Sequence, residues 1–313
     1  MLASLPRCDP AVDLLHGLAS LDSEVVVPAP GRGGGFWAGA PSAVVANGCV
    51  WLAYRLRRPV DRGRGYANVI ARSGDGLRFK TVATLTSDHF GCASLERPAL
   101  LRRPDGGWRL YVSCATPGSK HWWVEAIDAD VPVELCAGQR VMVLPGDGTE
   151  AWKDVVIQVD HQGWRMWACR HPLDGGDDAA DRMSTWFATS ADGLSWTMQA
   201  EALVPVPDTW NARGTRVTDV LYSHGKWWAL YDARRSADEN WLERSGLAVG
   251  DRPDRFTAIA GPVPEHAGAA LRYVSVIDIN GGRRAYFEAT GSDRSHDLRT
   301  VYIPHPSQDS QSG

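Results

Sequence analysis

The sequence predicts an all-β fold, a five-bladed β-propeller with four-stranded antiparallel blades around a central funnel. The first observation is a pattern that recurs five times, in which a short apolar run leads into a glycine turn and then an aromatic-rich strand. The second is the even spacing of that strand, whose anchor positions lie 57, 56, 64 and 56 residues apart: Trp51, Trp108, Trp164, Trp228 and Arg284. About 57 residues hold four strands of about six residues plus their turns, which is one propeller blade. A repeat of this kind cannot bury its own faces and must stack on its neighbours.

Each blade is expected to begin with a hairpin, because a tight-turn sequence separates its first two strands. These turns lie at residues 47–48, 105–107, 161–163, 224–225 and 280–282, and all of them contain glycine. Glycine and asparagine reach the positive φ that primed hairpin turns require. The loops that join the second strand to the third are longer and charged: residues 55–66, 116–121, 171–183, 234–243 and 291–297. Functional residues concentrate on loops held by a rigid scaffold, so the site is predicted on the face with the longer loops.

The two ends of the chain are predicted to close the ring. Residues 25–27 are expected to pair with residues 298–303, which form the third strand of blade five. Residues 1–305 then form one propeller domain, and the polar tail 306–313 is expected to be disordered. Two Asp-Gly segments, residues 73–79 and 190–196, are interpreted as outer-strand hairpins in which the Asp folds back on its own turn.

The composition is that of an ordinary globular protein, with 44% hydrophobic and 22% charged residues and a net charge of −4. A mildly acidic chain gives no electrostatic reason to expect a nucleic acid or an anionic membrane as partner. Residues 1–19 have no basic segment and contain Asp9, Asp13 and His16, so they do not indicate a signal peptide, and no apolar stretch is long enough to predict a membrane span. Six scattered cysteines without CxxC spacing indicate free thiols and favour a cytoplasmic location.

No cofactor or metal is predicted. The nine histidines are dispersed without an HxH or HxxxH pair, and the glycine run at 33–35 precedes no expected helix, unlike a nucleotide-binding loop. Four aspartates share one long loop: Asp174, Asp177, Asp178 and Asp181. Such a loop could hold Ca²⁺, but it is interpreted as a solvated acidic loop.

The innermost strands start at the funnel mouth, so their first residues include the candidate catalytic groups. Glu96, Asp154 and Asp219 begin blades two, three and four. Carboxylates separated by up to about 10 Å suit a general acid and a general base that flank a glycosidic bond. Close carboxylates also raise one pKa, so that one of them can donate a proton near neutral pH. The alternative is that Glu96 and Asp154 simply take part in ion pairs that stabilise the channel.

Cations and aromatic residues at the same strand ends and loops are the candidate substrate-binding groups. The basic candidates are Arg55, Arg97, Lys153, Arg170, His171 and Arg216. The aromatic candidates, expected to stack on a sugar ring, are Trp37, Trp152 and Tyr273. Many cations around few acids indicate an anionic substrate, such as a phosphate, a uronic acid or a sugar phosphate, because guanidinium groups bind oxyanions through two hydrogen bonds. An ion pair within the channel is the alternative for each arginine.

These strand starts resemble the five-bladed sugar-processing superfamily that includes glycoside hydrolase families 43, 32 and 130. Family 130, the mannoside phosphorylases and hydrolases, is the most similar. Its motifs are echoed in five places: Tyr54-Arg55, Glu96-Arg97-Pro98-Ala99, Lys153-Asp154, Arg170-His171-Pro172 and Gly214-Thr215. The resemblance spans most of the chain and implies a propeller with a sugar-binding pocket.

The sequence departs from these families at the residues that carry their chemistry. The catalytic acid of family 130 corresponds to Arg97, and the acidic residue that families 43 and 32 place on blade one corresponds to Ala40. The blade-four acid of family 43 would fall near Val217, so only the blade-three aspartate, Asp154, is matched.

Three functions follow from these observations. The first is a carbohydrate-active enzyme, a hydrolase or phosphorylase acting on a small and anionic sugar, with Glu96 and Asp154 as the working carboxylates and Asp219 in reserve. The second is a propeller that catalyses elimination or cyclisation of a biosynthetic intermediate, in which one base next to a cationic cluster removes a proton from carbon. The third is a propeller that binds such a ligand without turning it over.

Overall fold

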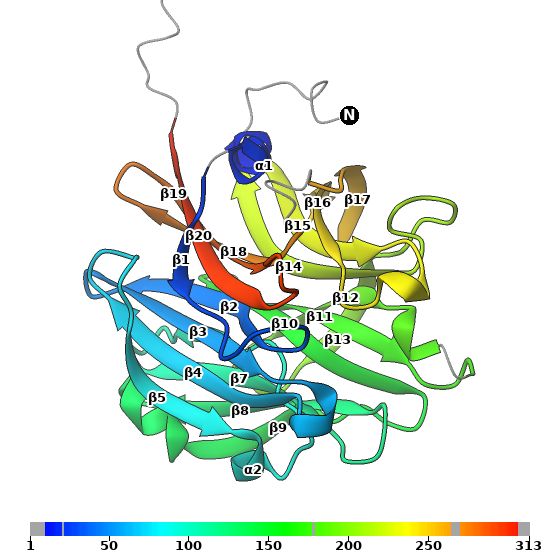
Figure 1. Cartoon of the computed structure of the whole chain (residues 1–313), viewed down its shortest axis with the longest axis horizontal. Coiled ribbons are helices and arrows are strands. Elements are labelled where there is room, and N and C mark those ends of the chain that lie inside the picture. Colours follow the sequence, from blue (N-terminus) through cyan, green and yellow to red (C-terminus); the bar gives the residue numbers. More distant parts are fainter. Residues whose placement is uncertain (1–9, 21, 177–178, 264–269, 306–313) are drawn as a thin grey trace, which may run out of the picture.

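A computed structural model describes residues 10–20, 22–176, 179–263 and 270–305, and it confirms the five-bladed β-propeller (Figure 1). Blade one contains β2 (Trp37–Ala46), β3 (Cys49–Arg57), β4 (Gly65–Ser73) and β5 (Lys80–Thr86). Blade two contains β6 (Ala99–Arg102), β7 (Trp108–Ala115), β8 (Trp122–Ala129) and β9 (Gln139–Leu144). Blade three contains β10 (Glu150–Asp160), β11 (Gly163–Pro172), β12 (Ser184–Ser190) and β13 (Thr197–Leu203). Blade four contains β14 (Gly214–Ser223), β15 (Lys226–Arg234), β16 (Arg244–Arg252) and β17 (Arg255–Ala260).

Blade five is built from both ends of the chain, as the sequence predicted. It contains β18 (Leu271–Ile279), β19 (Gly282–Thr290), β20 (His296–Pro304) and, as its outer strand, β1 (Glu24–Val27). Strand β1 pairs antiparallel with β20, with Val25 opposite Arg299. A single parallel pair between Trp37 and His296 links β20 to β2, so blades five and one form one continuous sheet. The predicted tail 306–313 lies outside the described residues.

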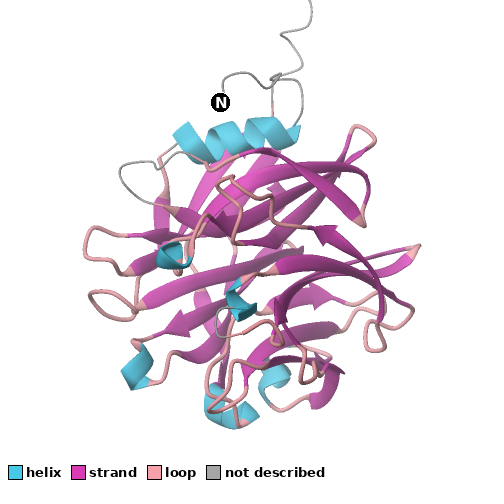
Figure 2. Cartoon of the chain, turned by 90° about the vertical axis from the view of Figure 1, so that its right-hand side faces the viewer, coloured by secondary structure: helices cyan, strands magenta, loops and turns pink. Residues whose placement is uncertain are grey.

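Short helices complete the chain, and none of them was predicted from the sequence. They are α1 (Pro10–Ser20), α2 (Ser87–Phe90) and the 3₁₀ turns Val60–Arg62, Pro132–Cys136, Ala179–Asp181 and Ala237–Glu239. Helix α1 lies across one edge of the molecule (Figure 2) and contacts β14 and β20. It buries an apolar stripe in the core shared by blades four and five: Ala11, Leu14, Leu15 and Leu18.

The tight turns and the inter-blade cores follow the predicted pattern. Asn47, His224 and Asn280 adopt positive φ, each followed by a glycine that does the same. The Asp75 carboxylate accepts hydrogen bonds from the backbone N–H groups of residues 77 and 78, which confirms the outer-strand hairpin predicted at residues 73–79. Large aromatic side chains fill the space between blades: the rings of Trp51 and Trp108 lie 5.0 Å apart, between blades one and two.

The innermost strands contact one another in a closed circuit around the axis: β2, β6, β10, β14 and β18. Three of them carry a bulge at the same place, where the register shifts and a non-glycine residue adopts positive φ: Ala40 on β2, Asp154 on β10 and Tyr273 on β18. Bulges re-aim side chains, and strained backbone of this kind clusters at functional sites. The bulges therefore mark the level of the funnel where a site is expected.

Candidate functional site

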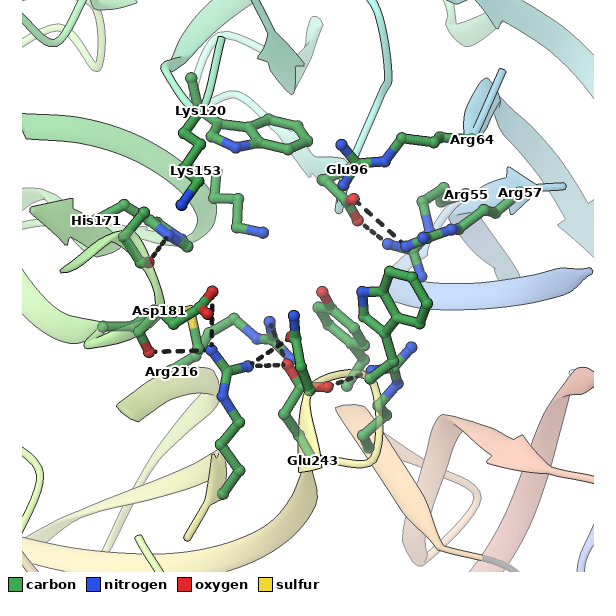
Figure 3. Close-up of a pocket in the computed structure, with 18 of the residues that line it drawn as sticks. Arg55, Arg57, Arg64, Glu96, Lys120, Lys153, His171, Asp181, Arg216 and Glu243 are labelled. Carbon is green, nitrogen blue, oxygen red and sulfur yellow. Dashed lines mark hydrogen bonds and ion pairs between the residues drawn. The ribbon is translucent and has the colours of Figure 1, made fainter. Parts of the chain in front are cut away.

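A cavity of about 180 Å³ opens at the funnel mouth, on the face with the long loops (Figure 3). It is smaller than the roughly 300–1,000 Å³ of pockets for drug-sized ligands, so it suits a small ligand. Four of the five long loops contribute to its wall, through residues such as Arg64, Lys120, Asp181 and Trp241. Residues at, or next to, the ends of strands form most of the remaining wall: Trp37, Arg55, Arg57, Glu96, Trp122, Lys153, His171, Met183, Arg216, Arg234, Glu243, Arg272 and Tyr273.

The wall of this cavity is strongly basic. Its cations are Arg55, Arg57, Arg64, Lys120, Lys153, Arg216, Arg234 and Arg272, and its carboxylates are Glu96, Asp181 and Glu243. The eight cations exceed the three carboxylates by five charges. His171 adds no charge, because burial and the nearby Lys153 lower its pKa well below the usual value. The positive potential of the cavity therefore favours an anionic ligand.

Buried carboxylates lie beneath the arginines of the cavity floor. Arg216 donates to Asp232 Oδ2 at 3.0 Å, and Arg272 lies 2.7 Å from Glu288 Oε1. Glu243 is contacted by Arg272 and, at 2.9 Å, by Arg234. Burial acts to raise the pKa of Glu243, but the surrounding guanidinium groups outweigh it and hold that pKa below its usual range. Glu243 and Glu288, whose pKa values are both lowered, therefore stay ionised and hold these arginines in place, whereas burial raises the pKa of Asp232.

Asp154 lies just below the cavity and is fully buried, with 0% of its surface exposed. Its Oδ1 accepts a hydrogen bond from Arg97 N–H at 3.1 Å, and its Oδ2 accepts one from Tyr273 Oη at 3.3 Å. Arg216 Nη1 and Lys153 Nζ lie 3.4 and 3.7 Å from Oδ2. Burial acts to raise the pKa of Asp154, yet Lys153 and Arg216 outweigh it and keep the pKa lowered. Asp154 is therefore an ionised carboxylate that touches the cavity only through its partners.

Tyr273 lines the cavity directly above Asp154. Its ring is covered by guanidinium groups, with Arg216 Cζ 3.9 Å and Arg272 Cζ 5.4 Å from the ring centroid. Its backbone N–H donates to Asp232 at 2.9 Å, which fixes the bulge. Burial raises the pKa of the phenol, so it stays protonated and donates to Asp154. Tyr273 therefore links the sealed carboxylate to the cavity.

Two groups in the cavity are placed to exchange protons or charge with a ligand. Lys153 lies with Nζ 4.7 Å from the Trp122 ring centroid, and burial lowers its pKa to about 8 despite the opposing effect of Asp154. Glu96 lines the cavity and forms an ion pair with Arg55, with Arg57 farther away at 4.0 Å. Figure 3 shows Lys153 and Glu96 pointing into the open centre from different sides.

The structure brings most of the predicted site residues to this cavity. Seven line it: Trp37, Arg55, Glu96, Lys153, His171, Arg216 and Tyr273. The aromatic ones do not offer free faces for stacking, because Arg57 Cζ lies 4.0 Å from the Trp37 ring centroid and His296 stacks on that ring at 4.5 Å. The predicted roles of Trp37 and Tyr273 as sugar-stacking platforms are not favoured by this packing.

Five predicted residues lie outside the cavity wall: Arg97, Trp152, Asp154, Arg170 and Asp219. Trp152 packs edge-on against Trp186 in the core. Arg170 pairs with Glu150 at 2.8 Å on the blade edge. Asp219 lies farther along the channel, where it accepts the Val276 N–H at 2.6 Å and burial raises its pKa to about 6.

Arg97 is buried below the cavity, where it joins four blades rather than binding substrate. From blade two, its guanidinium donates to backbone carbonyls of blades one, three and four: Pro41 at 3.2 Å, Val155 at 3.2 Å and Thr218 at 2.8 Å. Arg97 therefore has a structural contact with each of these three other blades instead of the predicted contact with substrate.

Several cavity residues were not predicted as catalytic or substrate-binding residues: Arg57, Arg64, Lys120, Trp122, Asp181, Arg234, Trp241, Glu243 and Arg272. Most of them belong to, or border, the long loops that were predicted to carry the site. Two signals were available, the arginine-rich stretch at residues 55–64 and Arg272 beside Tyr273. Within the described part of the chain, no cluster of three metal-ligating side chains occurs, and no helix has the length and apolarity to cross a membrane. Five cysteines described by the structure are free thiols.

Comparison with solved structures confirms the predicted resemblance at the level of fold. A thermostable family-43 glycoside hydrolase superposes with a TM-score of 0.67 at 13% identity, covering 90% of this chain and 94% of that one. The α-L-arabinofuranosidase from Lactobacillus brevis gives a TM-score of 0.65 at 14% identity, over 87% and 92% of the two chains. A structure from the GH130 family of mannoside phosphorylases gives 0.60 at 14% identity, over 89% and 87%. No protein-family model and no curated protein sequence matches the chain.

Proposed function

We propose that this protein is a carbohydrate-active enzyme whose funnel binds a small sugar that carries a negative charge. The observation that carries the proposal is the excess of cations around a cavity at the funnel mouth: eight line its wall, against three carboxylates on the wall and three more, Asp154, Asp232 and Glu288, beneath it. The fold is that of solved glycoside hydrolases. Arginine binds carboxylate and phosphate groups through two parallel hydrogen bonds, and a partly enclosed cavity strengthens such contacts. The solved structures of similar fold include glycoside hydrolases and a mannoside phosphorylase family member, which supports a carbohydrate as the ligand.

Hydrolysis or phosphorolysis requires one group that donates a proton and one that accepts it. Glu96 is the predicted carboxylate that reaches the cavity directly. Asp154 would act through Tyr273: as the phenol oxygen takes a proton from the attacking water or hydroxyl, the phenolic proton passes to Asp154 Oδ2, which lies 3.3 Å away. Lys153, whose pKa burial lowers to about 8, remains mostly protonated at neutral pH and would protonate the leaving oxygen.

A second candidate reaction is elimination from a sugar acid. Glu96 and Glu243 on the cavity wall are both engaged in ion pairs with arginine, which weakens their case as free acid and base. Arginines around the carboxylate of a uronic acid would stabilise the charge that develops when the neighbouring C–H proton is removed. Tyr273, backed by Asp154, would be the base in this reaction too; as the C=C bond forms, the bond to the leaving oxygen breaks and Lys153 would protonate that oxygen.

The test is a substrate panel of 4-nitrophenyl glycosides of neutral sugars, 4-nitrophenyl uronides, oligouronides and sugar phosphates. Nitrophenolate release reports hydrolysis, phosphate-dependent release reports phosphorolysis, and ultraviolet absorbance of an unsaturated product reports elimination. Turnover is expected only with acidic members of the panel. Asp154→Asn and Tyr273→Phe, which remove the proposed base, and Lys153→Met, which removes the proposed acid, should each lower turnover by about 10²-fold or more. Glu96→Gln should do the same if Glu96, rather than Lys153, is the proton donor.

The control is Glu201→Gln, which changes an exposed carboxylate on the outer strand β13 and should keep wild-type turnover. Turnover of neutral sugars alone would contradict the charge argument. Tight binding of an acidic sugar with no turnover of any panel member would favour the non-catalytic alternative.

A further inference from the structure

We infer that Arg57 and Arg64 form the subsite that binds the acidic group of the ligand, a carboxylate or a phosphate, at the blade-one side of the cavity. The inference rests on the proposed function, because it assumes that the funnel binds an acidic sugar. It goes further by naming the part of the cavity that binds the negative charge of the ligand and the residues that select for that charge. In Figure 3 these two arginines lie across the open centre from Lys153 and His171, so the rest of the ligand would extend toward that side.

The first observation is that the other cavity arginines already have close carboxylate partners. Each has a carboxylate oxygen at 3.0 Å or nearer: Arg55 with Glu288, Arg216 with Asp232, Arg234 with Glu243 and Arg272 with Glu288. Arg57 has only Glu96 Oε1, at the 4.0 Å limit, and Arg64 has no carboxylate within that limit among the described residues. The positive charge that remains unbalanced is therefore concentrated on this pair.

The second observation is the burial of these unbalanced charges. Arg57 is 3% exposed. Its Nε has no hydrogen-bond acceptor among the described residues, and the same holds for the buried Nε of Arg64 and for those of Arg55, Arg216 and Arg234. Over the ranges that the structure describes, Arg57 and Arg64 differ from the other three in also lacking a carboxylate nearer than 4.0 Å. Burial and the neighbouring Arg55, Arg64 and Arg272 lower the pKa of Arg57 to about 8, and burial and Arg55 lower the pKa of Arg64. A buried cation without a partner is costly, and an oxyanion from the ligand would supply the missing charge and acceptors.

The third observation is how the two guanidinium groups are held. Arg57 Cζ lies 4.0 Å from the Trp37 ring centroid and 5.1 Å from that of Trp241, while Arg64 Cζ lies 5.8 Å from that of Trp122. Cation–π packing engages the face of a guanidinium group and leaves its edge N–H groups available for an oxyanion. The indole rings therefore orient the arginines in place of carboxylates, which would compete with the ligand.

The loop that carries Arg64 is fixed in an unusual conformation. Gly63 and Arg64 both adopt positive φ, 98° and 51°, and the Arg64 carbonyl accepts a hydrogen bond from Arg58 N–H at 2.9 Å. Positive φ is uncommon for arginine and persists where the surrounding structure requires it. Here it returns the chain toward the cavity, so that Arg64 lines the wall beside Arg57.

The experiment measures anion binding by Arg57→Gln, Arg64→Gln and a matched control, Arg58→Gln. Arg58 neighbours Arg57 in sequence but is exposed and packs on Tyr66, 4.9 Å from its ring centroid. Thermal shift is recorded with sodium phosphate and sodium acetate against sodium chloride at equal ionic strength. Isothermal titration calorimetry then compares glucuronate, glucose 6-phosphate and glucose.

Wild type and Arg58→Gln are expected to be stabilised by phosphate or acetate and to bind the corresponding acidic sugar but not glucose. Arg57→Gln and Arg64→Gln should lose the anion-dependent shift and bind the acidic sugar at least tenfold more weakly. The anion that stabilises wild type more, phosphate or acetate, identifies the acidic group. Without anion, Arg57→Gln should melt no lower than wild type, because it removes an unbalanced charge; a residue with a purely structural role would lower the melting temperature.

Two outcomes would overturn the inference, and they differ in what they leave standing. If acidic sugars bind wild type and both variants equally, while Lys153→Gln abolishes binding, the acidic group lies elsewhere in the cavity and the proposed function survives. If wild type binds neither the simple anions nor the acidic sugars, the inference and the proposed function both fail.

Discussion

Asp154→Asn tests the charge balance beneath the cavity most directly. Asparagine keeps the shape of the side chain and tolerates the positive φ of 52° at this position, so the substitution isolates the charge. Its amide oxygen can still accept the Arg97 N–H. Lys153, at 3.7 Å, loses the charge of its carboxylate partner, and Arg216, at 3.4 Å, loses one of three carboxylate neighbours and keeps Asp232 and Glu243. Removing one member of a buried ion pair costs roughly 3–5 kcal/mol. Because one hydrogen bond is retained, we expect the lower end, about 3 kcal/mol.

Urea unfolding followed by tryptophan fluorescence measures this loss. With a slope of about 3 kcal/mol per M, the midpoint should fall by about 1 M. The pH dependence gives a further check, because the pKa of Asp154 is lowered in the folded protein. Its stabilising effect is then complete above the unfolded-state pKa of about 4 and is lost as pH falls through the lower folded-state value. The difference between wild type and variant should therefore be constant at neutral pH and shrink in acid.

The control for this measurement is Asp251→Asn, whose carboxylate is exposed and pairs with the exposed Lys226. It should leave the midpoint unchanged, since surface ion pairs contribute little. An unchanged midpoint for Asp154→Asn at neutral pH would refute the reasoning, because it would mean that the buried cations are neutralised by other groups.

Three further predictions concern other parts of the molecule. Arg97→Met should lower the free energy of unfolding by about 3 kcal/mol or more, since three carbonyls from three blades lose a buried charged donor; an equal loss for Arg97→Lys would show that the guanidinium geometry is required. Acidic-sugar affinity should fall as pH rises through about 8, to which burial lowers the pKa of Lys153, and calorimetry on Lys153→Met should show a shallower pH dependence. Deleting residues 1–28 should greatly lower the melting temperature, because it removes the outer strand of blade five and the apolar stripe of α1, whereas an unaffected melting temperature would contradict the ring closure.

The sequence was sufficient to predict the ring, because a blade is a local unit and its repeat is visible in turns and aromatic residues. The closure by β1 was also predictable, since blade five otherwise lacked an outer strand. Helix α1 was missed because its eleven residues follow no repeat, and a single amphipathic segment at the start of a chain of repeats carries no signal of its place in the fold.

The site was less predictable because bulges decide which side chains face the cavity. On β10 the register shifts between Lys153 and Val156, and a shift of one residue moves every side chain to the opposite face. Trp152 and Lys153 precede the shift and alternate as in any strand, Trp152 toward the core and Lys153 toward the cavity. The bulge instead re-aims Asp154, which alternation alone could not place. The positions of the loop residues Arg64 and Trp241 could not be predicted for another reason. Both residues adopt positive φ, in loop segments that do not repeat from blade to blade.

The buried ion cluster is better explained by a ligand-binding role than by a role in stabilising the fold. Replacing a buried ion cluster with apolar residues is often neutral or stabilising, so stability alone does not account for Arg55, Arg216 and Arg272 above Asp154 and Glu288. A cluster that served only the fold would also be balanced, with each guanidinium opposite a carboxylate. Here Arg55, Arg216 and Arg272 each have a carboxylate oxygen at 3.0 Å or nearer. Arg57, which packs against the exposed Trp241, has none nearer than 4.0 Å among the residues that the structure describes. An arrangement that is neutralised below and left positive above is the one expected if the missing negative charge arrives with a bound molecule.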